Sequence, residues 1–204
     1  MLNRNTFLLL LAPLPVLLVP LVAMQFTHEV NWTPRDFLAA WILLAGAGLA
    51  FRFAIRHALN LSFKIGAALA VVTALALMWA NLAVGLIGRE GNPANLFYGG
   101  VLAIGIVGAL LARGRPTGME RTLFAMAFAQ ILVPVIAVVC CATVVHWREL
   151  IGNALFALLF ITSALFFRFA AHRERCAAAE KADAAAAAVE GDYAPTMDGE
   201  DGGN

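Results

Sequence analysis

Runs of about twenty apolar residues recur along this chain, and they constrain its fold more than any other feature. A bilayer has a hydrocarbon core of about 30 Å, which a helix crosses with roughly 20 apolar residues at about 1.5 Å per residue. Six segments reach that length: 6–26, 37–55, 65–88, 94–112, 122–145 and 150–170. The last two are predicted to form a tight hairpin. We therefore predict an all-α fold, a polytopic membrane helix bundle with about six transmembrane helices.

The overall composition supports a membrane protein and excludes several soluble classes. Hydrophobic residues make up 62% of the chain and charged residues 13%, far from the balance of soluble domains. Basic residues flank apolar segments instead of lining a soluble face, which argues against a soluble enzyme, a disulfide-framed secreted domain or a nucleic-acid reader. The predicted partner is the lipid bilayer, with no nucleic acid.

Charge also divides the chain into two parts. Residues 1–179 carry 13 Lys and Arg against 6 Asp and Glu, whereas residues 180–204 carry 1 against 7. We predict a transmembrane helical domain over 1–175. Residues 176–204 are Ala-rich and then acidic, able to prolong the last helix at first, and are predicted to form a mostly disordered cytoplasmic tail.

The direction of threading follows from the positive residues, because Lys and Arg in short loops stay on the cytoplasmic side. The segments between spans alternate between a basic set and a poor set. The basic set holds eleven residues: Arg4, Arg52, Arg56, Lys64, Arg113, Arg115, Arg121, Arg168, Arg173, Arg175 and Lys181. The poor set holds only Arg35, Arg89 and Arg148. Both termini are therefore predicted in the cytoplasm and three short loops outside.

The first span has two interpretations. It is either a cleaved signal peptide or an uncleaved, irregular helix. The apolar run is longer than a typical signal core and lacks a clean small-x-small cleavage site, which favours the helix. Pro13, Pro15 and Pro20 are expected to weaken or bend it.

Helix starts and small residues give further local predictions. Thr33, Thr117 and Asn92 are expected to cap helices, each followed by Pro or an acid near the first turn. Small residues recur at four-residue spacing, which lets helix backbones approach closely within one chain or between chains. These pairs are Gly46 with Ala50, Gly66 with Ala70 and Ala74, Gly105 with Ala109, and Gly108 with Ala112. A homo-oligomer or a membrane-protein partner is compatible with them.

No Asp, Glu or Lys occupies the middle third of any predicted span, which argues against an ion-coupled carrier. Asn81 and Gln130 are the most notable polar residues within the spans. We expect them to form interhelical hydrogen bonds, and a pore or headgroup pocket is the sharper alternative. The histidines fall at the membrane interfaces, and no enzyme motif is present. We therefore predict no catalytic residue, no metal and no cofactor.

One long segment resembles a known family. Residues 79–98 read WANLAVGLIGREGNPANLFY. This is similar to a W-x-N-L-A-V-G-I-I-G-x-E-x-N-P-A-N-L-x-Y-like signature of small, uncharacterised bacterial inner-membrane proteins. The similarity extends over roughly Asp36 to Gln130 and includes a later pattern matched by Gly118, Met119, Arg121, Leu123, Phe124 and Ala125. The resemblance implies a bacterial inner-membrane location and no established activity. Family members carry an acidic residue where this chain has Arg52.

The same segment supplies the candidate site. We expect a polar patch at the outer mouth of the bundle, made of Asn81, Arg89, Glu90, Asn92 and Asn95. It can hold a headgroup or small solute, or it can simply form the turn between two spans. The predicted function is a non-enzymatic membrane bundle that assembles with itself or a partner. The alternatives are a small transporter or channel for a neutral or weakly polar solute and, ranked last, a lipid-modifying enzyme.

Overall fold

The computed structural model describes residues 11, 13–26, 32–56, 60–83, 85–88 and 92–192. Within these ranges the chain forms helices and no strand. It divides into two compact units, Met1–Ala170 and Ala171–Asn204. The helices are α2 (Pro13–Phe26), α3 (Pro34–Ile55), α4 (Leu61–Ala83), the 3₁₀ helix η1 (Pro93–Leu96), α5 (Phe97–Ala112), α6 (Pro116–Cys141) and α7 (Trp147–Asp192).

Five segments are long and apolar enough to cross a membrane, and they begin at Pro34, Leu61, Pro93, Pro116 and Trp147. The all-α membrane bundle predicted from the sequence is thus confirmed. The helix described within the first expected span, 6–26, is α2. It has 14 residues, fewer than a membrane crossing needs, and contains Pro20. Residues 6–10 and 12 of that span lie outside the described residues.

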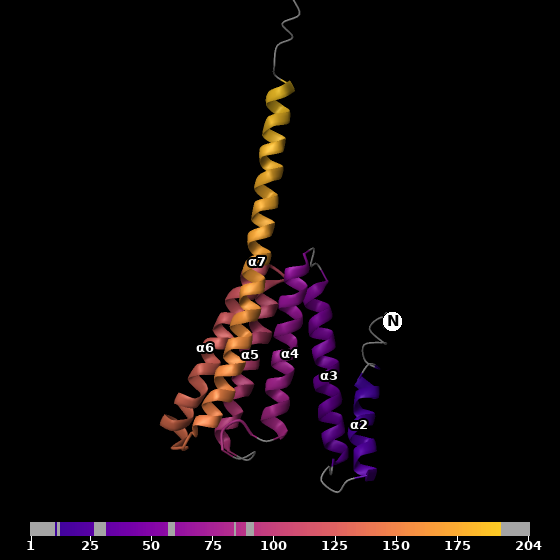
Figure 1. The fold of residues 1–204 in the computed structure, drawn as a ribbon, viewed down its shortest axis with the longest axis vertical. Helices are drawn as coiled ribbons and strands as arrows, with labels where there is room; N and C mark the ends of the chain where they lie inside the picture. The colour runs from indigo at the N-terminus through magenta and orange to yellow at the C-terminus, as the bar shows by residue number, and fades with distance from the viewer. Residues whose placement is uncertain are drawn as a thin grey trace, which may run out of the picture. The chain divides into compact units, whose positions relative to one another are not determined.

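Successive helices of the first unit run in alternating directions, so the loops gather at two ends (Figure 1). The C-terminus of α3, the N-terminus of α4 and the turn between α5 and α6 share one of them. We call it the basic end because it carries Arg52, Arg56, Lys64, Arg113, Arg115 and Arg121. The α4–α5 and α6–α7 connections lie at the opposite end. The basic segments, which alternate along the sequence with segments poor in Lys and Arg, therefore lie at the same end of the bundle.

The closest packing joins α5 to α6, and small residues make it possible. A Cβ added to Gly105 would lie 2.7 Å from the Met126 sulfur, and one added to Gly118 would lie 2.7 Å from Ala112 Cβ. Gly66 similarly lies against Phe166 and Phe167 of α7. These close approaches within one chain account for three of the predicted small-residue rows, since Gly108 contacts Thr122 in the same α5–α6 interface.

Two expected boundaries differ from the structure. The third span was expected to reach residue 88, but α4 ends at Ala83. Gly85 and Gly88 adopt a φ of 68°, a left-handed conformation that ends a helix and favours glycine. Thr117 was expected to cap α6, and this prediction is wrong because α6 begins at Pro116 after Arg115. Proline suits the first helical position, where no donor is needed, so the helix starts earlier.

The other predicted helix starts are confirmed. The Asp36 carboxylate accepts hydrogen bonds from Thr33 N at 2.7 Å and from Thr33 Oγ1 at 2.8 Å. Asn92 Oδ1 accepts a hydrogen bond from Ala94 N at 3.0 Å and caps η1. Both contacts satisfy backbone amides that a helix start leaves without an internal partner.

In the second unit, the Ala-rich residues expected to prolong the last helix do so, and α7 reaches Asp192. Side chains from His172 to Ala188 are exposed. Alanine has the highest helix propensity, so this stretch can stay helical without burying a face. Of the tail 176–204 that was predicted to be mostly disordered, residues 176–192 belong to α7, including Gly191 and Asp192 of its acidic part, and residues 193–204 lie outside the described residues.

Candidate functional site

Three of the predicted patch residues come together where α4 ends and η1 begins. Asn81 Nδ2 donates a hydrogen bond to Asn95 O at 3.2 Å, and Asn95 Oδ1 accepts one from Ile87 N at 3.0 Å. Asn92 serves as the η1 cap described above. Arg89 and Glu90, the other two members of the predicted patch, lie outside the described residues. The contacts that are described hold the backbone of the turn.

Glu149 also holds this turn. Its Oε1 accepts a hydrogen bond from Gly88 N at 3.0 Å, and its Oε2 accepts one from His146 N at 3.2 Å. The carboxylate therefore joins the start of α7 to the turn after α4, and it lies at a helix N-terminus, where negative charge is favourable. Glu149 directly follows Arg148 in the sequence, and nothing in the local pattern indicates a contact 61 residues away.

A second polar group lies deeper in the bundle, and we call it the buried trio: Tyr98, Gln130 and Asn153. Asn153 Oδ1 accepts hydrogen bonds from Tyr98 Oη at 2.7 Å and from Gln130 Nε2 at 3.1 Å. Asn153 Nδ2 donates to Glu149 O at 2.8 Å. All three side chains are buried, and they come from α5, α6 and α7. The trio thus fastens three helices together, and Gln130 forms the interhelical hydrogen bond expected of it.

Three buried oxygens lack a partner within the described part of the chain: Thr73 Oγ1, Asn81 Oδ1 and Gln130 Oε1. An unsatisfied polar atom in an apolar setting costs roughly 1–3 kcal/mol. These atoms are therefore able to bind a water molecule or the donor group of a small solute.

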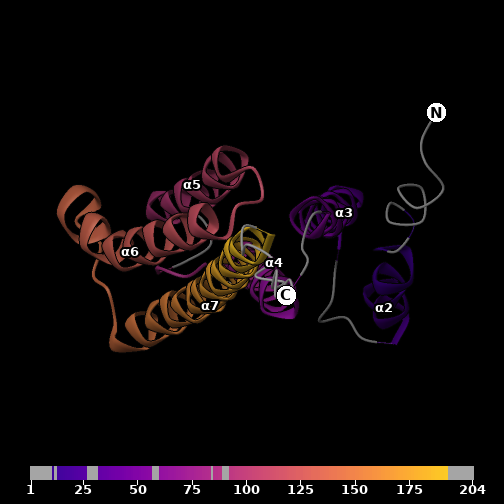
Figure 2. The same cartoon turned by 90° about the horizontal axis from the view of Figure 1, so that it is seen from above.

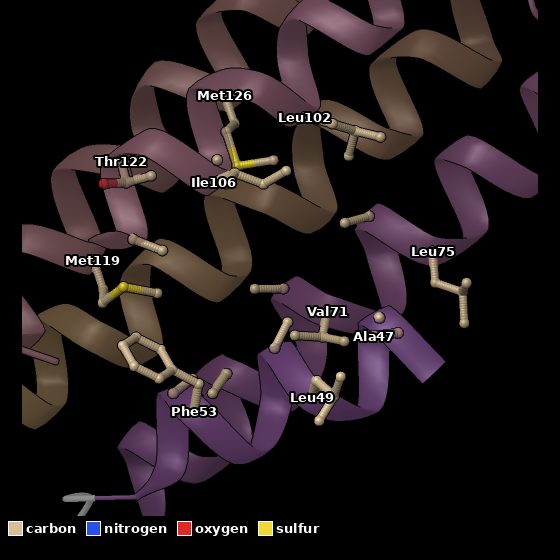
Figure 3. Close-up of a pocket in the computed structure, with 18 of the residues that line it drawn as sticks. Ala47, Leu49, Phe53, Val71, Leu75, Leu102, Ile106, Met119, Thr122 and Met126 are labelled. Carbon is tan, nitrogen blue, oxygen red and sulfur yellow. The ribbon is translucent and has the colours of Figure 1, made fainter. Parts of the chain in front are cut away.

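An apolar cavity lies within the first unit. A cavity of about 540 Å³ lies between the α3–α4 pair and the α5–α6 pair. Figure 3 shows Leu102 and Ile106 of α5 with Met119 and Met126 of α6 on one side, and Leu49, Phe53, Val71 and Leu75 of α3 and α4 on the other. Among the described residues, no ionisable side chain lines it, and the one polar side chain in the lining, Thr122, donates its hydroxyl hydrogen to Gly118 O.

The cavity has a closed floor and an open rim. Ala67 and Leu123 on the floor are 1% and 2% exposed, whereas Phe53 and Ile106 on the rim are 55% and 64% exposed. Viewed along the bundle, α3 and α5 lie apart from each other, with α4 between them across the view (Figure 2). In a membrane this rim would meet lipid, so an apolar molecule could enter from the side. The sequence did not predict this cavity.

No family model, curated protein or solved structure matches this chain. The resemblance of residues 79–98 to a bacterial inner-membrane family therefore remains a prediction.

Proposed function

We propose that the chain is a multi-pass protein of the bacterial inner membrane whose non-enzymatic role is to bind an apolar component of the membrane between its helices. The observation that carries this proposal is the cavity of about 540 Å³, whose described lining has no ionisable side chain. Its volume is in the range of ligand pockets, about 300–1,000 Å³, and its lining favours a hydrocarbon over a polar solute.

The described polar residues support binding rather than polar transport. Tyr98 and Gln130 donate to Asn153, Asn153 donates to the Glu149 carbonyl, and the carboxylate of Glu149 is used by two backbone amides. A path for a polar solute needs groups that exchange partners as the solute passes. Hydrogen bonds that fasten helices and turns are poorly suited to that exchange.

A second candidate function is a small transporter or channel for a neutral solute. It is favoured by the three unpartnered oxygens of Thr73, Asn81 and Gln130. They lie on α4 and α6, two helices that both line the apolar cavity. A hydrated route past these oxygens would require the bundle to open.

A flux assay separates the two functions. Proteoliposomes loaded with the full chain are expected to take up radiolabelled glycerol no faster than protein-free liposomes, because no continuous polar path is provided. Uptake is measured as initial rate against glycerol concentration. Saturable uptake that is abolished by Asn81→Leu, with Gly152→Leu as a matched control on an open helix face, would instead establish the transporter.

Threading across the membrane is tested with reporter fusions. We expect an alkaline phosphatase fused after Gly91 to be active and one fused to the carboxyl terminus to be inactive. The reason is that the basic end carries six of the positive residues and stays in the cytoplasm. Enzyme activity normalised to expression is the measurement. The reverse pattern of activities would invert the proposed orientation.

A further inference from the structure

The apolar cavity reaches the basic end of the bundle. Three of its lining residues at that end are Phe53, Phe63 and Thr122. Each directly neighbours a cation in the sequence, because Arg52, Lys64 and Arg121 occupy the adjacent positions. The cavity therefore combines a hydrocarbon-like interior with positive charge at one end.

The positive charge at the basic end is not neutralised by the described part of the chain. Its six cations stand against one acid on the same helix ends, Glu120. The ion pair that the described residues contain joins His146 to Glu149 and lies at the opposite end. None of the six cations has a carboxylate partner among the described residues. A negatively charged group arriving at this end would meet uncompensated charge.

The length of the cavity suits a long hydrocarbon chain. Phe63 and Met78 both line it and are fifteen residues apart on α4, a distance of about 22 Å at the helical rise. One leaflet contributes about half of a 30 Å hydrocarbon core, roughly 15 Å. A lipid tail lying along α4 would therefore remain in contact with the cavity over its whole depth in the leaflet.

Gly46 shows that part of this space is open. A Cβ added there would meet nothing within 4 Å, although Gly46 lies in the middle of α3 and lines the cavity. Gly66, Gly105 and Gly108, the glycines of the other three predicted rows, lie against side chains of the same chain. Gly46 has no such neighbour among the described residues, so the cavity has room for an occupant beside it.

A lipid fits this space better than a helix from a second copy of the chain. Two copies inserted in one membrane with the same orientation place their basic ends at the same level. Like charges would then gather around the cavity, which disfavours the association. An amphiphile with a negative head group brings the opposite charge to the same place.

We propose that the cavity binds one acyl chain of an anionic phospholipid, with the phosphate of its head group among the cations of the basic end. This inference rests on the proposed function and names its ligand class. The tail supplies the binding through burial of apolar surface, and the head group selects the orientation and the lipid.

Native mass spectrometry of the full chain in a mild detergent tests the site. The probe is an equimolar mixture of phosphatidylglycerol and phosphatidylcholine added to delipidated protein. The unmodified chain is expected to retain one phosphatidylglycerol. Gly46→Phe, which fills open space, is expected to reduce retention at least about tenfold, equivalent to losing roughly two buried methylenes. Gly152→Phe, also with nothing within 4 Å of its Cβ but outside the cavity, is expected to retain lipid normally.

The charge contribution is tested separately by Arg52→Gln, Lys64→Gln and Arg121→Gln. Each is expected to lower the preference for phosphatidylglycerol over phosphatidylcholine about fivefold. Arg168→Gln, on α7 and away from the cavity lining, serves as the control. Circular dichroism melting confirms that each variant is folded before retention is compared.

Three outcomes would overturn the inference. Equal lipid retention by Gly46→Phe and the unmodified chain would remove the site. A lipid-free dimer that Gly46→Phe dissociates would assign the cavity to a second copy. Retention of both lipids without preference would remove the head-group selection while leaving the proposed apolar binding intact. Failure of the proposed function itself would appear as saturable glycerol flux, which none of these three results produces.

Discussion

Replacement of Asn153 by leucine is expected to lower the free energy of unfolding by about 2–4 kcal/mol. Asn153 Oδ1 accepts two hydrogen bonds, so its loss leaves the Tyr98 hydroxyl and the Gln130 amide without their acceptor in a buried place. An abandoned buried donor costs about 1–3 kcal/mol, and interhelical bonds in membranes fall toward the lower values. The measurement is the thermal unfolding midpoint in detergent micelles, with an expected decrease of roughly 4–16 °C.

The matched controls remove one donor at a time. Gln130→Leu leaves Asn153 Oδ1 bonded to Tyr98 and also eliminates the unpartnered Gln130 Oε1. Tyr98→Phe leaves Asn153 Oδ1 bonded to Gln130. Each is expected to cost less than about 1 kcal/mol, because no buried group loses its last partner. If all three variants melt at the same temperature, the shared-acceptor role of Asn153 is refuted.

Only part of the buried trio could be predicted from the sequence. Gln130 was identifiable because a long polar side chain within an apolar span requires a hydrogen-bond partner. Its partner was not identifiable. Asn153 is separated from it by 23 residues and a loop, and contact depends on how α6 and α7 rotate about their axes. Tyr98 gave no signal, since aromatic residues near span ends are usual at membrane interfaces.

The helices themselves were predictable because their cause is local. The length of each apolar run is set by the bilayer, and η1 begins, as expected, where proline occupies the first helical position. The end of α4 was predicted too late, because the prediction followed hydropathy alone. Residues 85–88 continue the apolar composition, so hydropathy does not show that Gly85 and Gly88 take a left-handed backbone there.

The proximity of three patch residues was predictable, whereas the patch as a binding site stays a prediction. Asn81, Asn92 and Asn95 are brought together because a short connection forces the end of α4 and the start of η1 to be neighbours. Glu149 escaped prediction because its contact with Gly88 depends on packing of the α7 start against that turn. The cavity could not be predicted from the sequence either. A void is determined by the spacing of four helices, and no single helix carries its pattern.

Gly118 lies where α5 and α6 approach each other closely, against Ala112. Gly118→Ala is expected to destabilise the fold by about 1–3 kcal/mol, the usual cost of overpacking. The added Cβ would lie 2.7 Å from Ala112 Cβ and 2.9 Å from Ala112 Cα. A backbone atom cannot rotate away as a side chain can, so the two helices would have to separate. Thermal unfolding in micelles measures the loss.

Two further glycines make the sign of this effect testable. Gly105→Ala would also meet α6 at 2.7 Å, but the atom it meets is the sulfur of Met126, part of a flexible side chain. Its cost is expected to stay below about 1 kcal/mol. Gly46→Ala meets nothing within 4 Å and adds a better helix former, so it should stabilise α3 by up to about 1 kcal/mol.

The three alanines therefore give a ranked series: a loss at Gly118, little change at Gly105 and a gain at Gly46. Helix propensity alone would predict a gain at every position, and a general sensitivity of small-residue rows would predict a loss at every position. Only the distances between neighbouring helices give opposite signs. A gain at all three positions would show that α5 and α6 are not packed as closely as Gly118 and Ala112 imply. A loss at all three would show that Gly46 does not face open space.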